Sequence, residues 1–373
     1  MKPELIESTG MMDDLLERLS GVTLIAVDTE FFRETTYYPQ IALVQIATDS
    51  IVACVDPLAF DAKAPLRKLL LDDSITKIFH SCSQDLEVLF YYLGEAPGVI
   101  YDTQVANALL TEHHQIGYAS LVEEELGTVL DKSQTRTNWL QRPLTQKQLQ
   151  YAGDDVLYLY RLQHLLDEKL QRLGRKSWFE EESSKLLDDS NNYQVAEEHL
   201  WRRVKGTARL NRKQLAIVQA IAIWREALAR KKDRTRRKIL ADEIIVDLAV
   251  TPPQNMQAID HLIDRRYNFN DGEKQQLFDV VTASLETPRE QCPDNQFNAL
   301  DNEQKSTLKK LQQLVNKKAE ELGISPAILG SRKELEQLIL SHSKPVASNA
   351  SKLTILQGWR LRCIGQQLID NMK

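Results

Sequence analysis

The sequence lacks several features on which secreted, membrane-bound and zinc-binding proteins depend. Only four cysteines occur in 373 residues, and they lie far apart with no paired spacing: Cys54, Cys82, Cys292 and Cys363. This spacing argues against a disulfide framework and against a zinc site. No unbroken apolar run is long enough to span a membrane, and no apolar signal core precedes the acidic pair Asp13-Asp14. We therefore expect a protein of the reducing cytoplasm that has no membrane partner.

An excess of positive charge is also missing from the chain as a whole. The formal net charge is −6, with 47 lysines and arginines against 53 aspartates and glutamates. Basic residues nevertheless gather between Lys205 and Lys238, where only Glu226 and Asp233 oppose them. Such a cluster on one domain is typical of a surface that binds nucleic acid, and the alternative is an ordinary solvated helix. Composition alone favours neither interpretation.

The first half of the chain alternates between β-rich and helical runs. A short helix is predicted over 13–19, with Ser8 or Thr9 as a possible start, and an opening strand over 22–28. Strands over 41–47 and 51–55 are separated by turn residues, which predicts a hairpin. Helices and strands then alternate over 65–71, 75–79, 84–93, 99–101 and 103–110, as in a parallel part of a sheet. The expected fold is an α/β domain with a mixed sheet covered by helices.

Two acidic residues close the opening strand in this interpretation. Asp28 and Glu30 are two positions apart, so on a strand they project side by side. Neighbouring carboxylates raise each other's pKa unless cations neutralise them, and Mg²⁺ prefers oxygen ligands of this kind. An isolated Asp-x-Glu is more often an ordinary strand end, so the interpretation depends on residues further along the chain.

Further acidic residues fall where the same site needs them. Asp85 begins the helix that follows the fourth strand. A long helix is predicted from a capping box at 145–148 to about residue 173, and it carries Tyr151 and Asp155 on one face. Asp154 lies about 100° round this helix and is the poorer candidate. Four carboxylates and a tyrosine at strand and helix ends form a specific pattern.

The second half of the chain is predicted to be helical. An acidic segment over 178–192 connects it to the first half, and helices over 210–249 carry an apolar stripe of Leu215, Val218, Ile221, Ala222 and Leu228. Thr251-Pro252-Pro253 ends this run. Ala227, Ile239-Leu240 and Leu248 are echoed about 90 residues later by Ala319, Ile328-Leu329 and Leu338, with a linker at Pro293-Asp294-Asn295. The echo indicates two related helical domains.

These motifs resemble a known family of nucleases. Asp28-x-Glu30, the segment from His80 to Asp85 and Tyr151-x-x-x-Asp155 resemble the three exonuclease motifs of the DEDD superfamily, in the subgroup with a tyrosine in the third motif. Further segments resemble bacterial ribonuclease D over most of residues 20–170: Phe31-Phe32-Arg33, Thr36-Tyr37-Tyr38-Pro39-Gln40 and Arg136-x-x-Trp139-x-x-Arg142-Pro143-Leu144. The helical repeats resemble tandem HRDC domains, of which the second is divergent.

The resemblance implies a fold and a division into domains. It implies a ribonuclease-H-like exonuclease domain over 1–175, a helical connector over 176–205, an HRDC domain over 206–290 and an HRDC-like domain over 291–373. The implied activity is 3′-5′ exoribonuclease cleavage that releases nucleoside 5′-monophosphates. The implied substrate is RNA, in particular tRNA precursors with a single-stranded 3′ end. A monomer is expected, and no dinucleotide cofactor.

The same resemblance assigns roles to the acidic set. Asp28, Glu30, Asp85 and Asp155 are expected to hold two divalent ions, Mg²⁺ or Mn²⁺, with Asp28 as the bridging ligand. Two such ions activate a water, shield the phosphate and stabilise the leaving oxygen. Tyr151 is expected to orient the attacking water, because a phenol with a pKa near 10 is a poor base at neutral pH.

Other residues are weaker candidates for contact with RNA. His80 either contacts substrate or has a structural role, and Phe31 and Trp139 either stack on terminal bases or pack in the core. Asp102 is either a supporting acid or the cap of the following helix, and the cap is favoured. Phosphate contacts are assigned to the basic cluster, specifically to Arg230, Lys231, Lys232, Arg234, Arg236 and Arg237.

Two other functions fit parts of the sequence. A DNA exonuclease of the proofreading type shares the acidic residues, but no polymerase-like region follows them here. A non-catalytic RNA-binding protein with a degenerate nuclease domain is a second alternative, and the intact acidic set counts against it.

Overall fold

The computed structural model describes residues 1–131, 134, 137–188, 193, 195–263, 267–294, 300–343 and 353–372. Arg136, residues 189–192 of the acidic segment and Asn295 therefore lie outside the described residues. The chain forms two units. Unit 1 contains residues 1–32, 41–189 and 299–373, and unit 2 contains residues 33–40 and 190–298.

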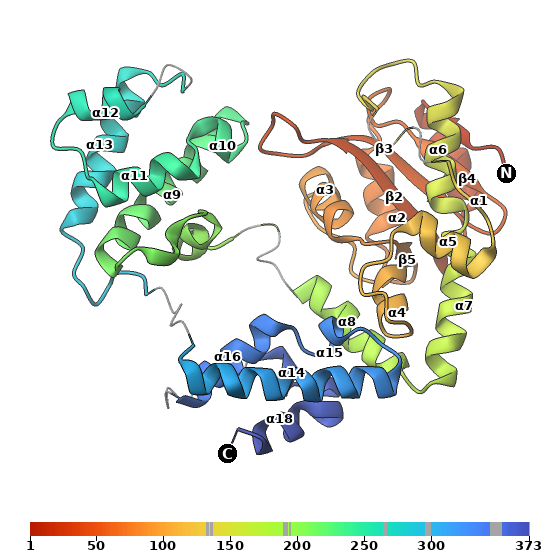
Figure 1. Ribbon diagram of the computed structural model, residues 1–373. Helices are drawn as coiled ribbons and strands as arrows, with labels where there is room; N and C mark the ends of the chain where they lie inside the picture. The colour runs from red at the N-terminus through yellow and green to blue at the C-terminus, as the bar shows by residue number, and fades with distance from the viewer. Residues whose placement is uncertain are drawn as a thin grey trace. The chain divides into compact units, whose positions relative to one another are not determined.

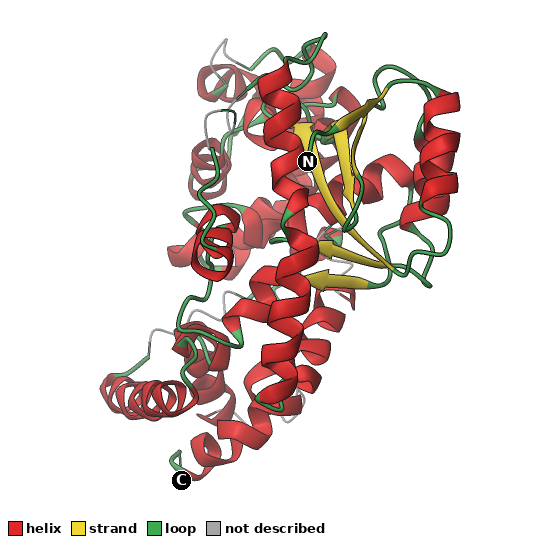
Figure 2. Ribbon diagram, turned by 90° about the vertical axis from the view of Figure 1, so that its right-hand side faces the viewer, coloured by secondary structure: helices red, strands yellow, loops and turns green. Residues whose placement is uncertain are grey.

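Unit 1 is built on a six-stranded sheet with the order β1-β4-β3-β2-β5-β6 (Figures 1 and 2). The strands are β1 (Glu4–Ile6), β2 (Leu24–Phe32), β3 (Gln40–Ala47), β4 (Val52–Val55), β5 (Thr76–Phe79) and β6 (Ile100–Asp102). β3 and β4 are antiparallel, whereas β1 with β4, β2 with β5 and β5 with β6 are parallel. The predicted mixed sheet is confirmed. The sequence prediction omits β1, because three residues are too few to show a strand pattern.

The opening strand is longer than predicted. β2 continues to Phe32, so Asp28 and Glu30 lie within the strand and the prediction that they close it is wrong. The aromatic pair Phe31-Phe32 favours the strand conformation and carries it past the charged residues. Because the alternation of side chains is unchanged, Asp28 and Glu30 still share one face of β2.

Eight helices of the described part of unit 1 lie between residues 9 and 188. They are α1 (Thr9–Arg18), α2 (Lys63–Leu70), α3 (Ser83–Leu93), α4 (Thr103–Ala108), α5 (Tyr118–Leu126), α6 (Gln146–Leu157), α7 (Leu159–Arg172) and α8 (Lys176–Asp188). Ser8 caps α1 and Thr145 with Gln148 forms the predicted capping box of α6. The prediction of a single helix from 145 to about 173 is wrong, because the structure has two helices there, α6 and α7, separated at Tyr158.

The last part of the chain completes the core of unit 1. Its helices are α14 (Asn302–Leu322), α15 (Pro326–Leu329), α16 (Arg332–Ser343), α17 (Gly358–Arg360) and α18 (Gln366–Asp370). Leu311 and Trp359 belong to the same buried cluster as Leu166 and Phe179. Trp359 stacks on Trp178 with ring centroids 4.5 Å apart, and its indole N–H donates to Glu182 at 2.9 Å. Residues 353–372 are thus an integral layer of this unit.

Unit 2 is helical in its described residues. It contains the 3₁₀ segments η2 (Glu197–Arg203) and η3 (Thr207–Arg209) and the helices α9 (Arg212–Lys232), α10 (Arg236–Ile239), α11 (Asp242–Val250), α12 (Met256–Leu262) and α13 (Asp271–Leu285). The predicted apolar stripe on α9 is buried. α9, α10 and α11 have counterparts in α14, α15 and α16 about 90 residues later, which matches the predicted repeat. Ala227 is exposed, and buried Ala229 takes the place equivalent to Ala319.

Among the described residues, none of the helices combines the length and apolarity that crossing a membrane requires.

A close approach at Gly153 fixes the position of α6. A Cβ at this glycine would lie 2.2 Å from Cγ of Pro3 and 3.3 Å from Cγ1 of Val52. Both neighbours are short side chains that cannot swing away, so the absence of a side chain at position 153 allows α6 to contact the N-terminal segment.

We expect Gly153→Ala to destabilise the protein although alanine is the better helix former. The gain in helix propensity is about 1 kcal/mol, and forcing a methyl group into a packed contact costs about 1–3 kcal/mol. Gly10→Ala in α1 is the matched control, because no described atom outside its own helical turn and chain neighbours lies within 4 Å of its Cβ position. Urea unfolding should show the two substitutions shifting the midpoint in opposite directions, and a midpoint raised by both would contradict the packing argument.

Candidate active site

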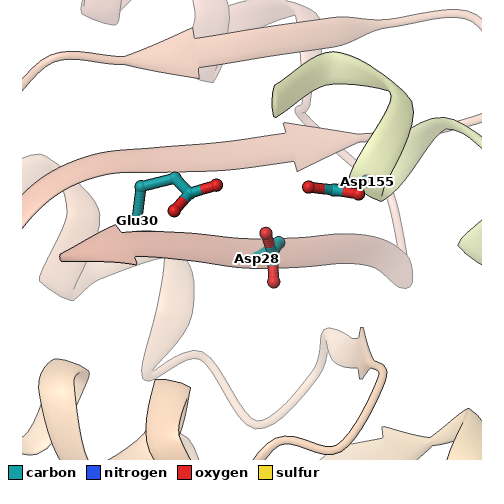
Figure 3. A group of neighbouring side chains, drawn as sticks. All are labelled: Asp28, Glu30 and Asp155. Atoms are coloured by element: carbon teal, nitrogen blue, oxygen red, sulfur yellow. The ribbon is translucent and has the colours of Figure 1, made fainter. Parts of the chain in front are cut away.

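Three carboxylates from two elements converge on one face of the sheet. Asp28 and Glu30 project from β2, and Asp155 projects from α6 (Figure 3). One carboxylate oxygen from each lies within 4.8 Å of the other two, and all three side chains are half-buried. Asp155 is at least 125 positions from Asp28 and Glu30 in the sequence. The three meet because α6 packs on β2 and β4.

Asp155 is the carboxylate of α6 that joins this group, as its spacing from Tyr151 predicts. A hydrogen bond from Tyr151 to the Asp155 side chain lowers the pKa of that carboxyl group against the larger effect of burial. Asp154 instead accepts a hydrogen bond from Nε2 of Gln150 at 2.9 Å, and it is not part of the carboxylate group. The tyrosine one turn earlier therefore holds Asp155 in place.

Asp85 has a position different from that of the other three acids. It lies in the first turn of α3 and is buried, and its Oδ1 accepts hydrogen bonds from the backbone N–H of Thr29 at 3.1 Å and from the Thr29 hydroxyl at 2.6 Å. These bonds hold Asp85 beside β2, next to Asp28. The three-carboxylate group does not include it, but its charge raises the pKa of Asp28 and of Glu30, so it belongs to the same charged site.

The acidic set is electrostatically unfavourable in the protein alone. Burial, followed by the charges of the neighbouring carboxylates, raises the pKa of Asp28 well above its ordinary value and that of Glu30 to about 9. Burial raises the pKa of Asp85 and of Asp155 to about 7. The main interactions acting on these groups in the described part of the chain are desolvation, other carboxylates and hydrogen bonds, with no lysine or arginine among them.

Divalent metal ions fit this set of donors. All four groups offer oxygen, the ligand type that Mg²⁺ and Mn²⁺ prefer, and a bound cation would remove the mutual repulsion. The metal would also favour the ionised carboxylates that burial disfavours. The residues present therefore match the group that the sequence predicts.

His80 and Asp102 both have structural contacts. The ring nitrogens of His80 are 2.9 Å from the Thr103 hydroxyl and 2.9 Å from the Ile116 carbonyl, and burial lowers the pKa of the imidazole. These contacts favour the structural alternative for His80. Asp102 accepts from the backbone N–H of Gln104 at the start of α4, so the predicted cap is confirmed.

The two aromatic candidates for base stacking differ in exposure. Trp139 is only 5% exposed and lies against Tyr151, with ring centroids 6.1 Å apart. This position favours the packing alternative and makes Trp139 a support for the tyrosine of the site. Phe31 is half-buried at the end of β2 and remains a candidate for contact with RNA.

Part of the predicted basic cluster forms ion pairs within unit 2. Arg236 pairs with buried Glu226, Arg230 lies 3.5 Å from the same carboxylate, and both arginines donate to the Tyr37 hydroxyl. Tyr37 belongs to the loop of residues 33–40, which is a part of unit 2. Lys232 pairs with Glu273. Lys231, Arg234 and Arg237 are exposed and contact no buried acid in the part of the chain that the structure describes, although Arg237 lies 3.1 Å from exposed Glu243. Arg230 is also exposed but faces Glu226.

Sequence reasoning missed two residues near the site. Thr29 contacts Asp85, and Tyr118, at the start of α5, is close enough to Asp155 and Asp28 for their charges to raise its pKa after burial does so. Neither stands out in the sequence, because a strand threonine and a helix tyrosine are common. Tyr118 follows His80 by 38 positions, and only the folded chain brings its ring to 5.6 Å from the imidazole.

Comparison with protein families divides the chain into three matching segments. Residues 3–171 match the 3′-5′ exonuclease family, residues 214–263 match the HRDC domain and residues 303–368 match the C-terminal HRDC domain of ribonuclease D. The divergent second helical domain is therefore recognised as a member of the HRDC group.

Whole-chain relatives agree with these segments. The chain is 36% identical to ribonuclease D of Desulfotalea psychrophila over 347 residues, which cover 91% of each protein. It is 32% identical to ribonuclease D of Escherichia coli over 373 residues, which cover 99% of this chain and 98% of the relative. The crystal structure of E. coli RNase D, described as an exoribonuclease involved in structured RNA processing, superposes with a TM-score of 0.86 at 31% identity, covering 100% of this chain and 99% of that chain.

We expect the stability of the metal-free protein to fall as the pH rises from about 5 to 9. Because the pKa values of Asp85 and Asp155 are raised to about 7 and that of Glu30 to about 9, the folded state retains protons that the unfolded state has already released. The contribution of these groups to the free energy of unfolding is fully present at low pH and is lost as the pH rises through about 7 and then about 9. Thermal unfolding in EDTA across this range measures the effect.

Asp28→Asn should raise the metal-free unfolding temperature at pH 8.5 by about 2 °C or more, because burial and the neighbouring carboxylates disfavour the ionised form of Asp28 and an amide carries no charge. Asp154→Asn is the matched comparison and should raise it less, since the Asp154 charge repels Asp155 but Asp154 lies outside the carboxylate group. A flat pH dependence in EDTA would contradict the charge repulsion inferred here.

Proposed function

The chain belongs to the ribonuclease D family of 3′-5′ exoribonucleases, and from this premise we propose that it hydrolyses phosphodiesters by a two-metal mechanism. Asp28, Glu30, Asp85 and Asp155 would hold two divalent ions, Mg²⁺ or Mn²⁺, with Asp28 as the shared ligand. The products would be nucleoside 5′-monophosphates. The observation that carries the proposal is the group of three carboxylate oxygens within 4.8 Å of one another, with Asp85 beside it.

The metal ions would supply the Lewis-acid chemistry, by neutralising the phosphate and by making a water a better nucleophile at neutral pH. The residues of the chain supply the geometry. Asp28 and Glu30 are fixed by the pairing of β2 within the sheet, Thr29 fixes Asp85, and Tyr151 fixes Asp155. Four ligands on three separate elements are thereby held without help from substrate.

Tyr151 is proposed to orient the attacking water. Its side chain lies on the same face of α6 as Asp155 and is hydrogen-bonded to that carboxylate. A phenol with a pKa near 10 that is held by an acceptor is suited to positioning a water rather than to removing its proton.

RNA with a structured body and a single-stranded 3′ end is the proposed substrate, with tRNA precursors as the specific case. The E. coli relative is described as acting in structured RNA processing, and the exposed cations of unit 2 are suited to binding phosphates. We further propose that the protein acts as a monomer in the cytoplasm. The functional boundaries proposed from the sequence, near residues 175, 205 and 290, remain part of this proposal.

We expect Asp28→Asn and Asp155→Asn to abolish release of nucleotides from RNA, because each removes a ligand oxygen with its charge. Tyr151→Phe should lower kcat much more than it weakens metal binding, because it removes the hydroxyl that orients the water and leaves all four carboxylate ligands in the chain. Loss of its hydrogen bond to Asp155 should weaken metal binding to a smaller extent. The assay uses matched RNA and DNA oligonucleotides labelled at the 5′ end, with and without EDTA. The order in which shortened products appear reports the polarity of cleavage.

Asp154→Asn is again the matched control and should retain activity. Full cleavage by Asp28→Asn, or cleavage that persists in EDTA, would contradict the two-metal proposal. Equal or faster cleavage of the DNA oligonucleotide would favour the proofreading type of exonuclease over an RNA-specific enzyme.

The triple substitution Lys231→Gln, Arg234→Gln and Arg237→Gln should weaken binding to a tRNA-sized RNA and reduce its salt dependence. Removing three phosphate contacts should reduce the magnitude of the slope of log K against log salt by about 2–3. Cleavage of a short single strand should change little. An unchanged salt slope would show that these exposed cations do not contact RNA.

Arg236→Gln tests the other part of the cluster. It removes the main partner of Glu226, whose side chain is only 6% exposed, so we expect a loss of stability of about 2 kcal/mol or more. The triple variant should unfold like the wild type. Measuring unfolding and binding for both variants separates the structural cations from those that contact substrate.

A further inference from the structure

The break between α6 and α7 has a side chain at its centre. In a continuous helix the carbonyl of Asp154 would accept a hydrogen bond from the backbone N–H of Tyr158. Here that carbonyl accepts a hydrogen bond of 2.9 Å from the hydroxyl of Tyr118. The backbone N–H of Tyr158 interacts with the same hydroxyl and is also directed at the carbonyl of Val156. The tyrosine hydroxyl thus inserts into the helical hydrogen-bond ladder.

Insertion of a polar group into the ladder is a recognised cause of helix kinks. α6 ends at Leu157 and α7 begins at Leu159, and Tyr158 between them has φ −96° and ψ −12°. Asp155 is therefore in the last turn before the break. The carbonyl that Tyr118 contacts belongs to Asp154, the residue immediately before Asp155 in the chain.

Contacts with His80 and with the segment before α5 fix the position of Tyr118. Its ring lies 5.6 Å from that of His80, and the carbonyl of Ile116 accepts hydrogen bonds from His80 and from Nε2 of Gln104, each at 2.9 Å. Gly117 then leads into α5, which begins at Tyr118. His80 precedes α3, which carries Asp85, and Tyr118 contacts the turn of α6 that carries Asp155. The contact between His80 and Tyr118 therefore connects the segments of these two predicted ligands.

We propose that Tyr118 is a positioning residue of the metal site, whose hydroxyl holds the last turn of α6 open at Asp154 and so aims the Asp155 carboxylate at Asp28 and Glu30. The inference rests on the proposed function, in which Asp155 is a metal ligand. It also gives His80 a role, as the support of the segment that carries Tyr118. Without the hydroxyl, the Tyr158 N–H is able to bond directly to the Asp154 carbonyl, and the turn that carries Asp155 rotates.

The test compares Tyr118→Phe with Tyr101→Phe in the full chain. The Tyr101 hydroxyl is also buried in unit 1 but makes no hydrogen bond in the part of the chain that the structure describes. Binding of Mn²⁺ is measured by titration calorimetry per mole of folded protein, below the unfolding transition. Loss of a residue that orients a metal ligand typically weakens metal binding or activity about 10- to 100-fold.

We expect Tyr118→Phe to weaken Mn²⁺ binding by about 10-fold or more and to lower kcat on a short RNA, with the KM for RNA unchanged within about twofold. Tyr101→Phe should bind and turn over like the wild type. Unfolding in EDTA checks that both variants fold. A merely structural role for Tyr118 would lower stability without changing the Mn²⁺ affinity of the folded protein.

The outcomes separate this inference from the proposed function. Equal Mn²⁺ affinity for the wild type and Tyr118→Phe would overturn the positioning role and leave the metal site intact. Absence of Mn²⁺ binding by the wild type itself would overturn both. If Tyr118→Phe and Tyr101→Phe weakened binding equally, the loss of a buried hydroxyl would be the cause, and the specific role of Tyr118 would be refuted.

Discussion

Four neighbouring carboxylates, one buried and three half-buried, repel one another, and the surrounding fold has to hold them together. Asp28, Glu30, Asp85 and Asp155 lie so close together that burial and mutual charge raise the pKa of the set. Left to themselves, such side chains would separate or take up protons. The fold prevents the first response, since Thr29 holds Asp85 and Tyr151 holds Asp155. The site therefore retains protons when it holds no metal, its oxygen donors are suited to divalent cations, and the sheet and α6 provide the rigidity it needs.

Local patterns in the sequence were sufficient for much of this architecture. The spacing of Asp28 and Glu30 predicts their common face, the capping box at Thr145 predicts the start of α6, and the four-residue interval from Tyr151 identifies Asp155 rather than Asp154. Each of these features depends on neighbours within one turn or one strand. The extension of β2 to Phe32 was not predicted, because Asp28 and Glu30 interrupt the apolar run before the aromatic pair Phe31-Phe32 continues the strand.

Features that depend on distant contacts were beyond a single sequence. The break at Tyr158 has no proline or glycine to mark it, since its cause is the Tyr118 hydroxyl from another helix. The distinction between cations that contact the buried Glu226 and cations that face only the surface depends likewise on a distant residue, Tyr37, which is 189 positions from Glu226. A cluster of charges that reads as one surface therefore contains two groups with different physical roles.

The loop of residues 33–40 has a practical consequence for dissecting the protein. Tyr37 contacts Glu226, Arg230 and Arg236, and Asp233 accepts from the backbone N–H groups of Tyr37 and Tyr38 at 3.0 Å each. A recombinant fragment cut at residues 206 and 290 would leave out the phenol that contacts these side chains, together with Leu200, Trp201 and Val204 of the same buried cluster. Its Glu226 would face two arginines and water. An expression vector for this module therefore has to supply the peptide 33–40 as well, either fused or in trans.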